Sequence, residues 1–218
     1  MNLERYEYTN AREYKEYDFY SIGPKGRIRK VVQFVRVPAF NIPYYNLVLG
    51  DWDDTQNKLD ITSVTNNGDA EKVLATVAAI VVDFTMFFDE MMVYATGSTV
   101  TRTRRYQMGI NKFLYEIEKI FYVYGYTGEA WESFEKNVNY CAFLITRKEF
   151  VILEEETESY MISSQKNNGN TKRVYNDRTV DKLTDAYKDP AVIKKTEEAK
   201  KFLEEHPFPD ELLKKHRK

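Results

Sequence analysis

The sequence has few of the residues that build common catalytic and metal sites. It contains one cysteine, Cys141, and two histidines, His206 and His216. A single cysteine excludes an intramolecular disulfide and is typical of a reducing compartment. Because both histidines lie near the C-terminal end, a Ser-His-Asp or Cys-His arrangement and a Cys/His zinc site are excluded from the rest of the chain. We therefore expect no cofactor, assign no catalytic or metal-binding residue, and leave open whether the protein is an enzyme.

Long hydrophobic runs and an excess of basic charge are also missing. No stretch approaches the roughly 18 consecutive apolar residues of a membrane span, and residues 1–19 lack the apolar core of a signal peptide. We therefore expect a cytoplasmic protein with no membrane partner. The formal net charge is -2, so any nucleic-acid binding requires a local basic patch.

The hydrophobic pattern predicts an α+β fold. Alternating residues predict strands over 17–22 and 28–37, on either side of a GPKG turn. Two further strands are expected in YYNLVLGDWD and LDITSVT, and helical periodicity predicts helices over 70–88 and 101–121. We expect a mostly antiparallel sheet of about six to eight strands with two main helices packed on it.

Three local features are expected within this domain. The carboxylate of Asp69 is expected to cap the first helix. A short helical piece is expected around Trp131, and Cys141 is expected to be buried in an apolar strand.

The composition changes near residue 155. Residues 1–154 are expected to form the α+β domain, whereas residues 155–218 are expected to form a polar linker and a C-terminal amphipathic helix extension. Two arrangements of the extension remain open, because it can dock on its own domain or on a partner, including a second copy. The apolar stripe of its helix consists of Val192, Ile193, Ala199, Phe202 and Leu203.

The strongest candidate site is the stretch ATGSTVTRTRRY, where a strand turns into a helix. Free amides at a helix N-terminus bind anions, whereas cations in that first turn oppose the helix dipole. Three arginines placed against this rule suggest a function. The candidate ligand-binding residues are Ser98, Thr99, Arg102, Arg104 and Arg105.

Helical geometry distinguishes the three arginines. Arg102 is expected to point inward, Arg105 to lie at the edge of the apolar stripe, and Arg104 to point away. A buried guanidinium needs a partner. That partner is either a ligand phosphate or an internal carboxylate, and both alternatives remain open. The internal candidates are Asp51, Asp53 and Asp69.

Two weaker features lie in the N-terminal half. Lys25, Arg27 and Arg29 are candidate nucleic-acid contacts, because Arg27 and Arg29 share one face of a strand. A solvated strand face is the simpler explanation for them. The carboxylates of GDWDD can hold Mg²⁺, but a hairpin turn also favours aspartate there.

Four segments resemble a family of uncharacterised bacterial proteins. They are GPKGRIRKVVQF, YNLVLGDWD, NNGDAEKVLATVA and GSTVTRTRRYQMGI. The resemblance covers roughly residues 1–148 and implies a domain of unknown function without a mechanism. The polar residues that it carries over by position are Lys25, Asn67, Asp69, Lys72, Ser98, Thr99, Arg102, Arg104 and Tyr106.

The sequence thus supports one leading function and two alternatives. The leading one is a binding module for a phosphate-bearing ligand, either nucleic acid or a nucleotide. The alternative is a protein-interaction or assembly component that forms a homo-oligomer and binds no small molecule. A carboxylate-metal hydrolase is the weaker alternative.

Overall fold

The computed structural model describes two stretches of the chain. These are residues 4–148, except 12, 39, 41, 42, 64, 89 and 90, and residues 189–212, except 210. The boundary expected near residue 155 and the expected polar linker lie outside the described residues.

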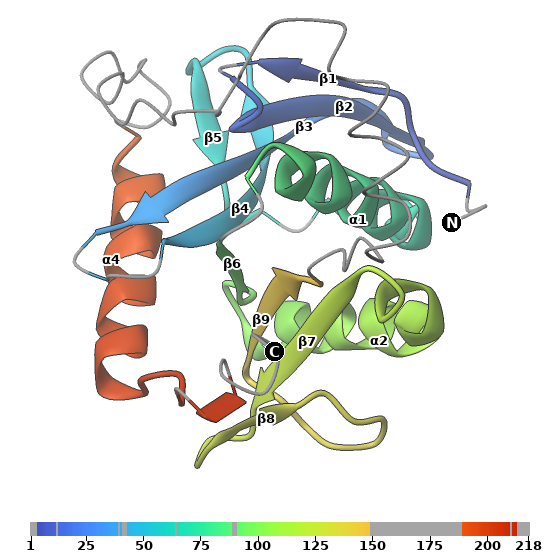
Figure 1. Cartoon of the computed structure of the whole chain (residues 1–218). Helices are drawn as coiled ribbons and strands as arrows, with labels where there is room; N and C mark the ends of the chain where they lie inside the picture. Colours follow the sequence, from blue (N-terminus) through green and yellow to red (C-terminus); the bar gives the residue numbers. More distant parts are fainter. Residues whose placement is uncertain are drawn as a thin grey trace, which may run out of the picture. The chain divides into compact units, whose positions relative to one another are not determined.

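Nine strands in the described residues form one sheet (Figure 1). Their order is β1-β2-β3-β4-β6-β9-β7-β8, and β5 pairs with the end of β4. Neighbouring strands are antiparallel except for β4 and β6, so the expected α+β class is confirmed. The strands are β1 (Tyr8–Ala11), β2 (Glu16–Gly23), β3 (Gly26–Val37), β4 (Tyr44–Asp53), β5 (Lys58–Asp60), β6 (Met92–Ala95), β7 (Phe121–Tyr126), β8 (Trp131–Ser133) and β9 (Ala142–Arg147).

The parallel contact between β4 and β6 joins two antiparallel halves of the sheet. Only three residue pairs form it, from Tyr44 with Met92 to Asn46 with Tyr94. A parallel pair needs a crossover connection, and helix α1 (Ala70–Phe87) lies in that connection. The hairpins β1–β5 therefore form one half, and β6–β9 form the other.

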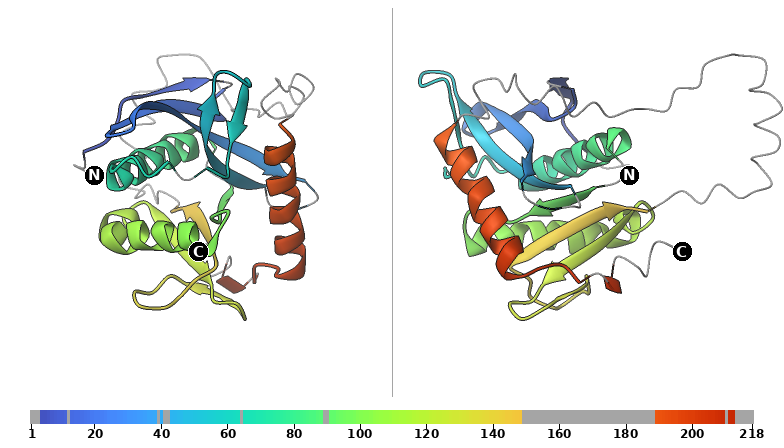
Figure 2. Two further views of the ribbon diagram at one scale, coloured as in Figure 1. Left: turned by 180° about the vertical axis from the view of Figure 1, so that it is seen from behind. Right: turned by 60° about the vertical axis from the view of Figure 1, so that its left-hand side comes forward.

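Helices α1 and α2 (Val100–Ile117) cover one face of this sheet (Figure 2). Ile80 and Phe84 of α1 are fully buried in the core cluster, which also contains Leu114 of α2. The ring of Phe84 stacks on that of Phe34 in β3, with centroids 3.7 Å apart. Burial of an apolar stripe of this kind is the main source of helix stability in a globular domain.

The opposite face is covered by α4 (Pro190–Glu205). Val192, Ala199 and Leu203 are at most 3 % exposed in two core clusters with residues of the sheet. The carboxylate of Asp189 accepts the amide of Ala191 at 2.8 Å and that of Leu59 at 3.2 Å. The sequence left open whether this helix docks on its own domain or on a partner. In the structure it docks on its own domain.

Several local expectations were wrong. Residues around Trp131 form strand β8 rather than a helix, because the strand pairs with β7 through contacts that local sequence does not encode. Cys141 is exposed rather than buried. Asp69 occupies the N-cap position of α1 without a side-chain cap hydrogen bond, because its carboxylate accepts the hydroxyls of Tyr6 and Ser21 instead.

Candidate functional site

The strand-to-helix corner before α2 is filled by its own chain. The hydroxyl of Thr99 caps the helix by accepting the amide of Arg102 at 3.3 Å. Gly97 donates its amide to the hydroxyl of Thr103 at 3.0 Å. A Cβ atom on Gly97 would lie 2.4 Å from the backbone nitrogen of Thr103, so only glycine permits this approach.

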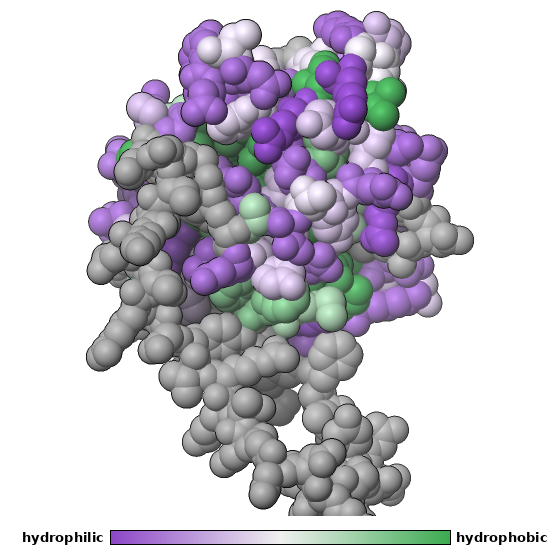
Figure 3. Space-filling model, turned by 90° about the horizontal axis from the view of Figure 1, so that it is seen from above, coloured by the Kyte–Doolittle hydropathy of each residue, from purple (hydrophilic) through white to green (hydrophobic). Residues whose placement is uncertain are grey.

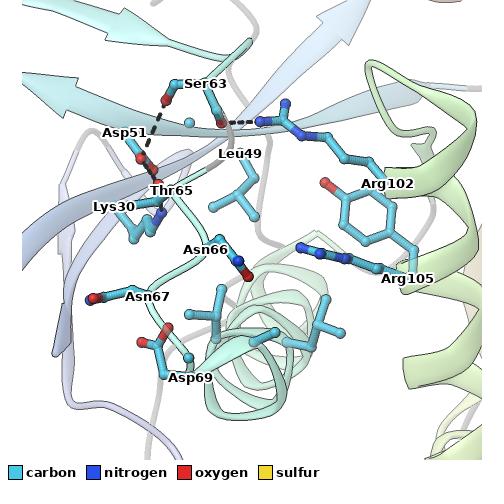
Figure 4. A pocket seen from close by; sticks show the side chains of 16 residues that line it. Lys30, Leu49, Asp51, Ser63, Thr65, Asn66, Asn67, Asp69, Arg102 and Arg105 are labelled. Carbon is cyan, nitrogen blue, oxygen red and sulfur yellow. Dashed lines mark hydrogen bonds and ion pairs between the residues drawn. The ribbon is translucent and has the colours of Figure 1, made fainter. Parts of the chain in front are cut away.

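Arg102 holds a loop through neutral oxygen atoms. Its half-buried guanidinium donates to the carbonyl oxygens of Ile61, Thr62 and Ser63, the second at 3.1 Å, and to the Ser98 hydroxyl at 2.6 Å. Figure 4 shows the contact with Ser63. The expectation of an internal carboxylate partner at Asp51, Asp53 or Asp69 is therefore wrong, because backbone carbonyls take that place. None of these acceptors neutralises the positive charge of the guanidinium.

The other two arginines of the corner differ in direction. Both are exposed, but Arg104 lies outside the pocket beside the corner, whereas Arg105 is one of the residues that line it. The side chain of Arg105 extends from α2 toward Asn66 (Figure 4). Within the described part of the chain, no carboxylate or other hydrogen-bond acceptor contacts the Arg105 guanidinium.

The pocket has a volume of about 120 Å³ and lies beside the first turns of α1 and α2. Each of the four segments that carry the family resemblance contributes to its lining. Lys30 comes from the first segment, Gly50 and Asp51 from the second, and Arg102, Arg105 and Tyr106 from the fourth. The third segment contributes Asn66, Asn67, Gly68, Asp69, Ala70, Val73 and Leu74.

The charges around this pocket are unequally compensated. The ammonium group of Lys30 donates to the Asp51 carboxylate and to the Thr65 hydroxyl, the latter at 2.8 Å. The Asp69 carboxylate accepts hydroxyls from Tyr6 at 2.8 Å and Ser21 at 2.6 Å. Three cationic and two anionic side chains line the pocket, so their net charge is +1. Lys30 pairs with Asp51, and the two arginines outweigh the Asp69 carboxylate, whose neutral hydroxyl donors leave its charge in place.

Tyr106 adds a neutral hydrogen-bonding group to the lining. Burial raises the pKa of its phenol, and the charge of Arg102 opposes this shift. The phenol therefore stays protonated at physiological pH and can donate a hydrogen bond to an anion.

Asn67 connects the pocket to the hairpin between β2 and β3. Its buried side chain accepts the amide of Lys25 at 2.9 Å and donates to the carbonyl of Gly26 at 3.1 Å. A Cβ atom on Gly23 would lie 1.9 Å from the Asn67 carbonyl oxygen. The GPKG and NNGD segments therefore fold as one unit, and this contact across about 40 residues is not visible in the local sequence pattern.

The basic hairpin does not extend the positive charge of the pocket. The guanidinium of Arg29 lies 3.3 Å from the Asp18 carboxylate, and that of Arg27 stacks 3.7 Å above the Tyr20 ring. Because strand residues alternate between faces, both arginines lie on the opposite face from Lys30, which lines the pocket. The ammonium group of Lys25 donates to the carbonyl of Thr65 at 2.7 Å.

In the acidic segment GDWDD, the Asp53 carboxylate makes hydrogen bonds within its own turn. It accepts the hydroxyl of Thr55 at 2.5 Å and the amides of Thr55 and Gln56 at 2.8 and 3.1 Å. These contacts, the hydroxyl foremost, lower the pKa of Asp53. Among the described residues, no group of three or more His, Cys, Asp or Glu side chains is placed to hold a metal ion.

Across the described ranges, no helix is both long and apolar enough to cross a membrane.

Comparison with known proteins identifies the family of this chain. No curated protein and no solved structure matches the chain. One family model matches residues 2–148, which is more than half of the chain and contains the whole lining of the pocket. The chain therefore belongs to DUF6934, a family of unknown function.

Proposed function

We propose that this protein binds a small phosphate-bearing ligand, a nucleotide or another phosphate ester, in the pocket between the first turns of α1 and α2. The observation that carries this proposal is Arg105, a cation that lines a pocket and has no acceptor among the described residues. Guanidinium groups bind phosphate through paired, charge-assisted hydrogen bonds. The Arg105 guanidinium is therefore the group that contacts the phosphate.

The surroundings of Arg105 favour an anion over a neutral ligand. Arg102 keeps its full charge because its acceptors are neutral oxygen atoms. The protonated phenol of Tyr106 can donate a hydrogen bond into the same pocket. The role of Arg102 is to position the loop and supply a positive field. The Ser98 hydroxyl accepts from Arg102 and the Thr99 hydroxyl caps α2, so neither is assigned to the ligand.

A nucleic-acid backbone is a less suitable ligand than a single small phosphate ester. Arg27 and Arg29 already contact Tyr20 and Asp18, and they lie on the other face of the sheet. A continuous track of cations, which an extended backbone requires, is therefore interrupted between the hairpin and Arg105. The assembly alternative also lacks a supporting surface on the face seen in Figure 3, where the coloured hydrophobic residues form small areas among hydrophilic ones.

The proposal is tested by isothermal titration of the full chain with inorganic phosphate and with adenosine monophosphate. The variant Arg105→Gln removes the charge that contacts the ligand, and Arg104→Gln is the matched control at the adjacent exposed position. One charge-assisted interaction corresponds to about 10- to 100-fold in affinity. We expect Arg105→Gln to weaken binding by this factor and Arg104→Gln to leave it nearly unchanged.

Two outcomes contradict the proposal. The first is the absence of binding by the unmodified protein to any phosphate-bearing compound at low ionic strength, where electrostatic attraction is strongest. The second is equal loss of affinity in the two variants, which would indicate a diffuse charge effect rather than a site at Arg105.

A further inference from the structure

A second cavity adjoins the pocket just described and has a different chemical character. Its volume is about 110 Å³, and its lining is almost entirely apolar. Leu74 and Tyr106 line both cavities. The lining of the second cavity consists of Leu47, Leu74, Val77, Ala78, Val81, Ala95, Tyr106, Gly109, Ile110, Phe113, Ile117, Phe121, Phe143 and Ile145.

Both helices line the first cavity with their first turns and the second cavity with residues further along the chain. In α1, Ala70 and Val73 line the polar pocket, and Val77 and Val81 line the apolar cavity. In α2, the two arginines are followed along the helix by apolar residues of the second cavity. Residues three or four apart lie on one face of a helix, so α1 lines both cavities with apolar side chains, whereas α2 presents a polar end and an apolar end.

Strand β4 forms the floor of both cavities. Asp51 and Leu49 line the polar pocket, and Leu47 lines the apolar cavity. These three residues are two apart along the strand and therefore share one face. Two elements, α2 and β4, thus change from polar to apolar along the same direction, and Leu74 and Tyr106 line both cavities, which makes the two cavities the ends of one groove.

We propose that this groove binds an amphipathic phosphate ester, with the phosphate at Arg105 and a short apolar chain beside Ala78 and Phe113. This inference rests on the proposed function and adds the chemistry of the remainder of the ligand. The charge at one end and the apolar walls at the other complement such a molecule. A nucleotide, whose sugar and base are rich in polar groups, would leave those groups without partners in the apolar cavity.

The size of the groove limits the length of the chain. Pockets for drug-sized ligands measure about 300–1,000 Å³, and each of the two cavities is well below this range. We therefore expect a chain of a few carbon atoms rather than a long acyl chain.

The experiment is a calorimetric titration of the full chain with methyl, butyl and hexyl phosphate. Each methylene group that enters an apolar site tightens binding by about threefold to fourfold. We therefore expect affinity to rise steadily from methyl to hexyl phosphate. Hexanol tests the chain without the phosphate and is expected to bind at least tenfold more weakly than hexyl phosphate, a loss in the range of one charge-assisted interaction.

Two variants with the same substitution locate the chain. Ala78→Leu places a larger side chain in the apolar cavity, and Ala130→Leu makes the same change at an exposed position outside both cavities. We expect Ala78→Leu to remove the dependence on chain length while leaving the affinity for methyl phosphate unchanged. Ala130→Leu should reproduce the unmodified protein.

If Ala78→Leu does not fold, as judged by its thermal transition, Val77→Met provides a second change in the wall of the same cavity. Equal affinity for all three esters would overturn the inference but leave the proposed function intact. Tighter binding of adenosine monophosphate than of hexyl phosphate would have the same meaning. Failure of every phosphate compound to bind would instead remove the proposed function itself.

Discussion

Helices cover both faces of the sheet, but only the helices on one face lie within the residues that the family model matches. Helices α1 and α2 lie within residues 2–148, which the family model matches, and they leave a groove with two cavities. Helix α4 lies outside those residues and covers the other face. One face therefore has two cavities beneath its helices, whereas the other is covered by a helix outside the matched residues.

The position of α4 explains why an added helix matters. Its N-terminal end is bound to β5 through Asp189 and Leu59, and the carbonyl that follows its C-terminal end accepts the indole N–H of Trp131 at 2.9 Å. These contacts lie in different halves of the sheet, which β4 and β6 join through only three residue pairs. Helix α4 therefore stabilises the connection between the halves.

Truncation after Lys148 is expected to have the largest effect on stability. It removes the buried side chains of Val192, Leu203 and Phe208 and exposes the apolar sheet surface beneath them. Each buried side chain contributes about 1.5–3 kcal/mol, and the sum is comparable to the total stability of a typical domain. Urea denaturation followed by circular dichroism should show a strongly destabilised or unfolded chain. An unchanged unfolding midpoint would show that the face under α4 does not need its helix.

Arg102→Ala is expected to have the next largest effect. It leaves the carbonyl oxygens of residues 61–63 without their donor; Ile61 is buried, whereas Thr62 and Ser63 are exposed and can bind water instead. We expect a cost of about 1–3 kcal/mol. Arg104→Ala, the neighbouring exposed control, should change stability by less than about 0.5 kcal/mol. Urea denaturation of both variants provides the comparison, and equal effects would show that Arg102 does not hold the loop.

Lys195 in α4 is expected to make stability depend on pH. Burial, and secondarily the charge of Arg102, lowers its pKa from 10.5 to about 8. Between these two values the unfolded chain binds a proton that the folded chain does not, so this group makes stability rise with pH across that window. The rise is at most about 3 kcal/mol.

The matched variants for this prediction are Lys195→Met and Lys194→Met. Lys194 is the adjacent residue and its side chain is 78 % exposed. We expect only Lys195→Met to remove the rise in urea midpoint between pH 8 and 10, relative to the unmodified protein. Identical pH profiles of the two variants would show that the buried amine is not responsible.

Arg105→Gln is expected to have the smallest effect on stability. Its guanidinium has no acceptor among the described residues, so its removal should change the free energy of unfolding by less than about 0.5 kcal/mol. Thermal unfolding of this variant beside Arg102→Ala makes the contrast direct. A loss above about 1 kcal/mol would assign Arg105 a structural role and would weaken the case for a ligand contact.

The two faces also differ in how far the sequence predicts them. Periodicity predicts α1, α2, and the pairing of β2 with β3, because these depend on local patterns and a GPKG turn. It also predicts that Arg102 points inward while Arg104 points away. The carbonyl acceptors of Arg102 were not predicted, because they come from a loop about 40 residues earlier in the chain. The pocket, the direction of Arg27 and Arg29, and the docking of α4 depend on similarly distant contacts.

Nuclear magnetic resonance tests directly whether a ligand binds in the groove between α1 and α2. Amide chemical shifts of the full ¹⁵N-labelled chain would be followed during titration with hexyl phosphate, with inorganic phosphate as the second titrant. We expect shifts that concentrate at residues 66–70 and 102–106 for both titrants, and further shifts around Ala78 and Phe113 for hexyl phosphate alone. Shifts confined to the Lys25–Lys30 hairpin, shifts confined to α4, or no shifts with either titrant would contradict binding in this groove.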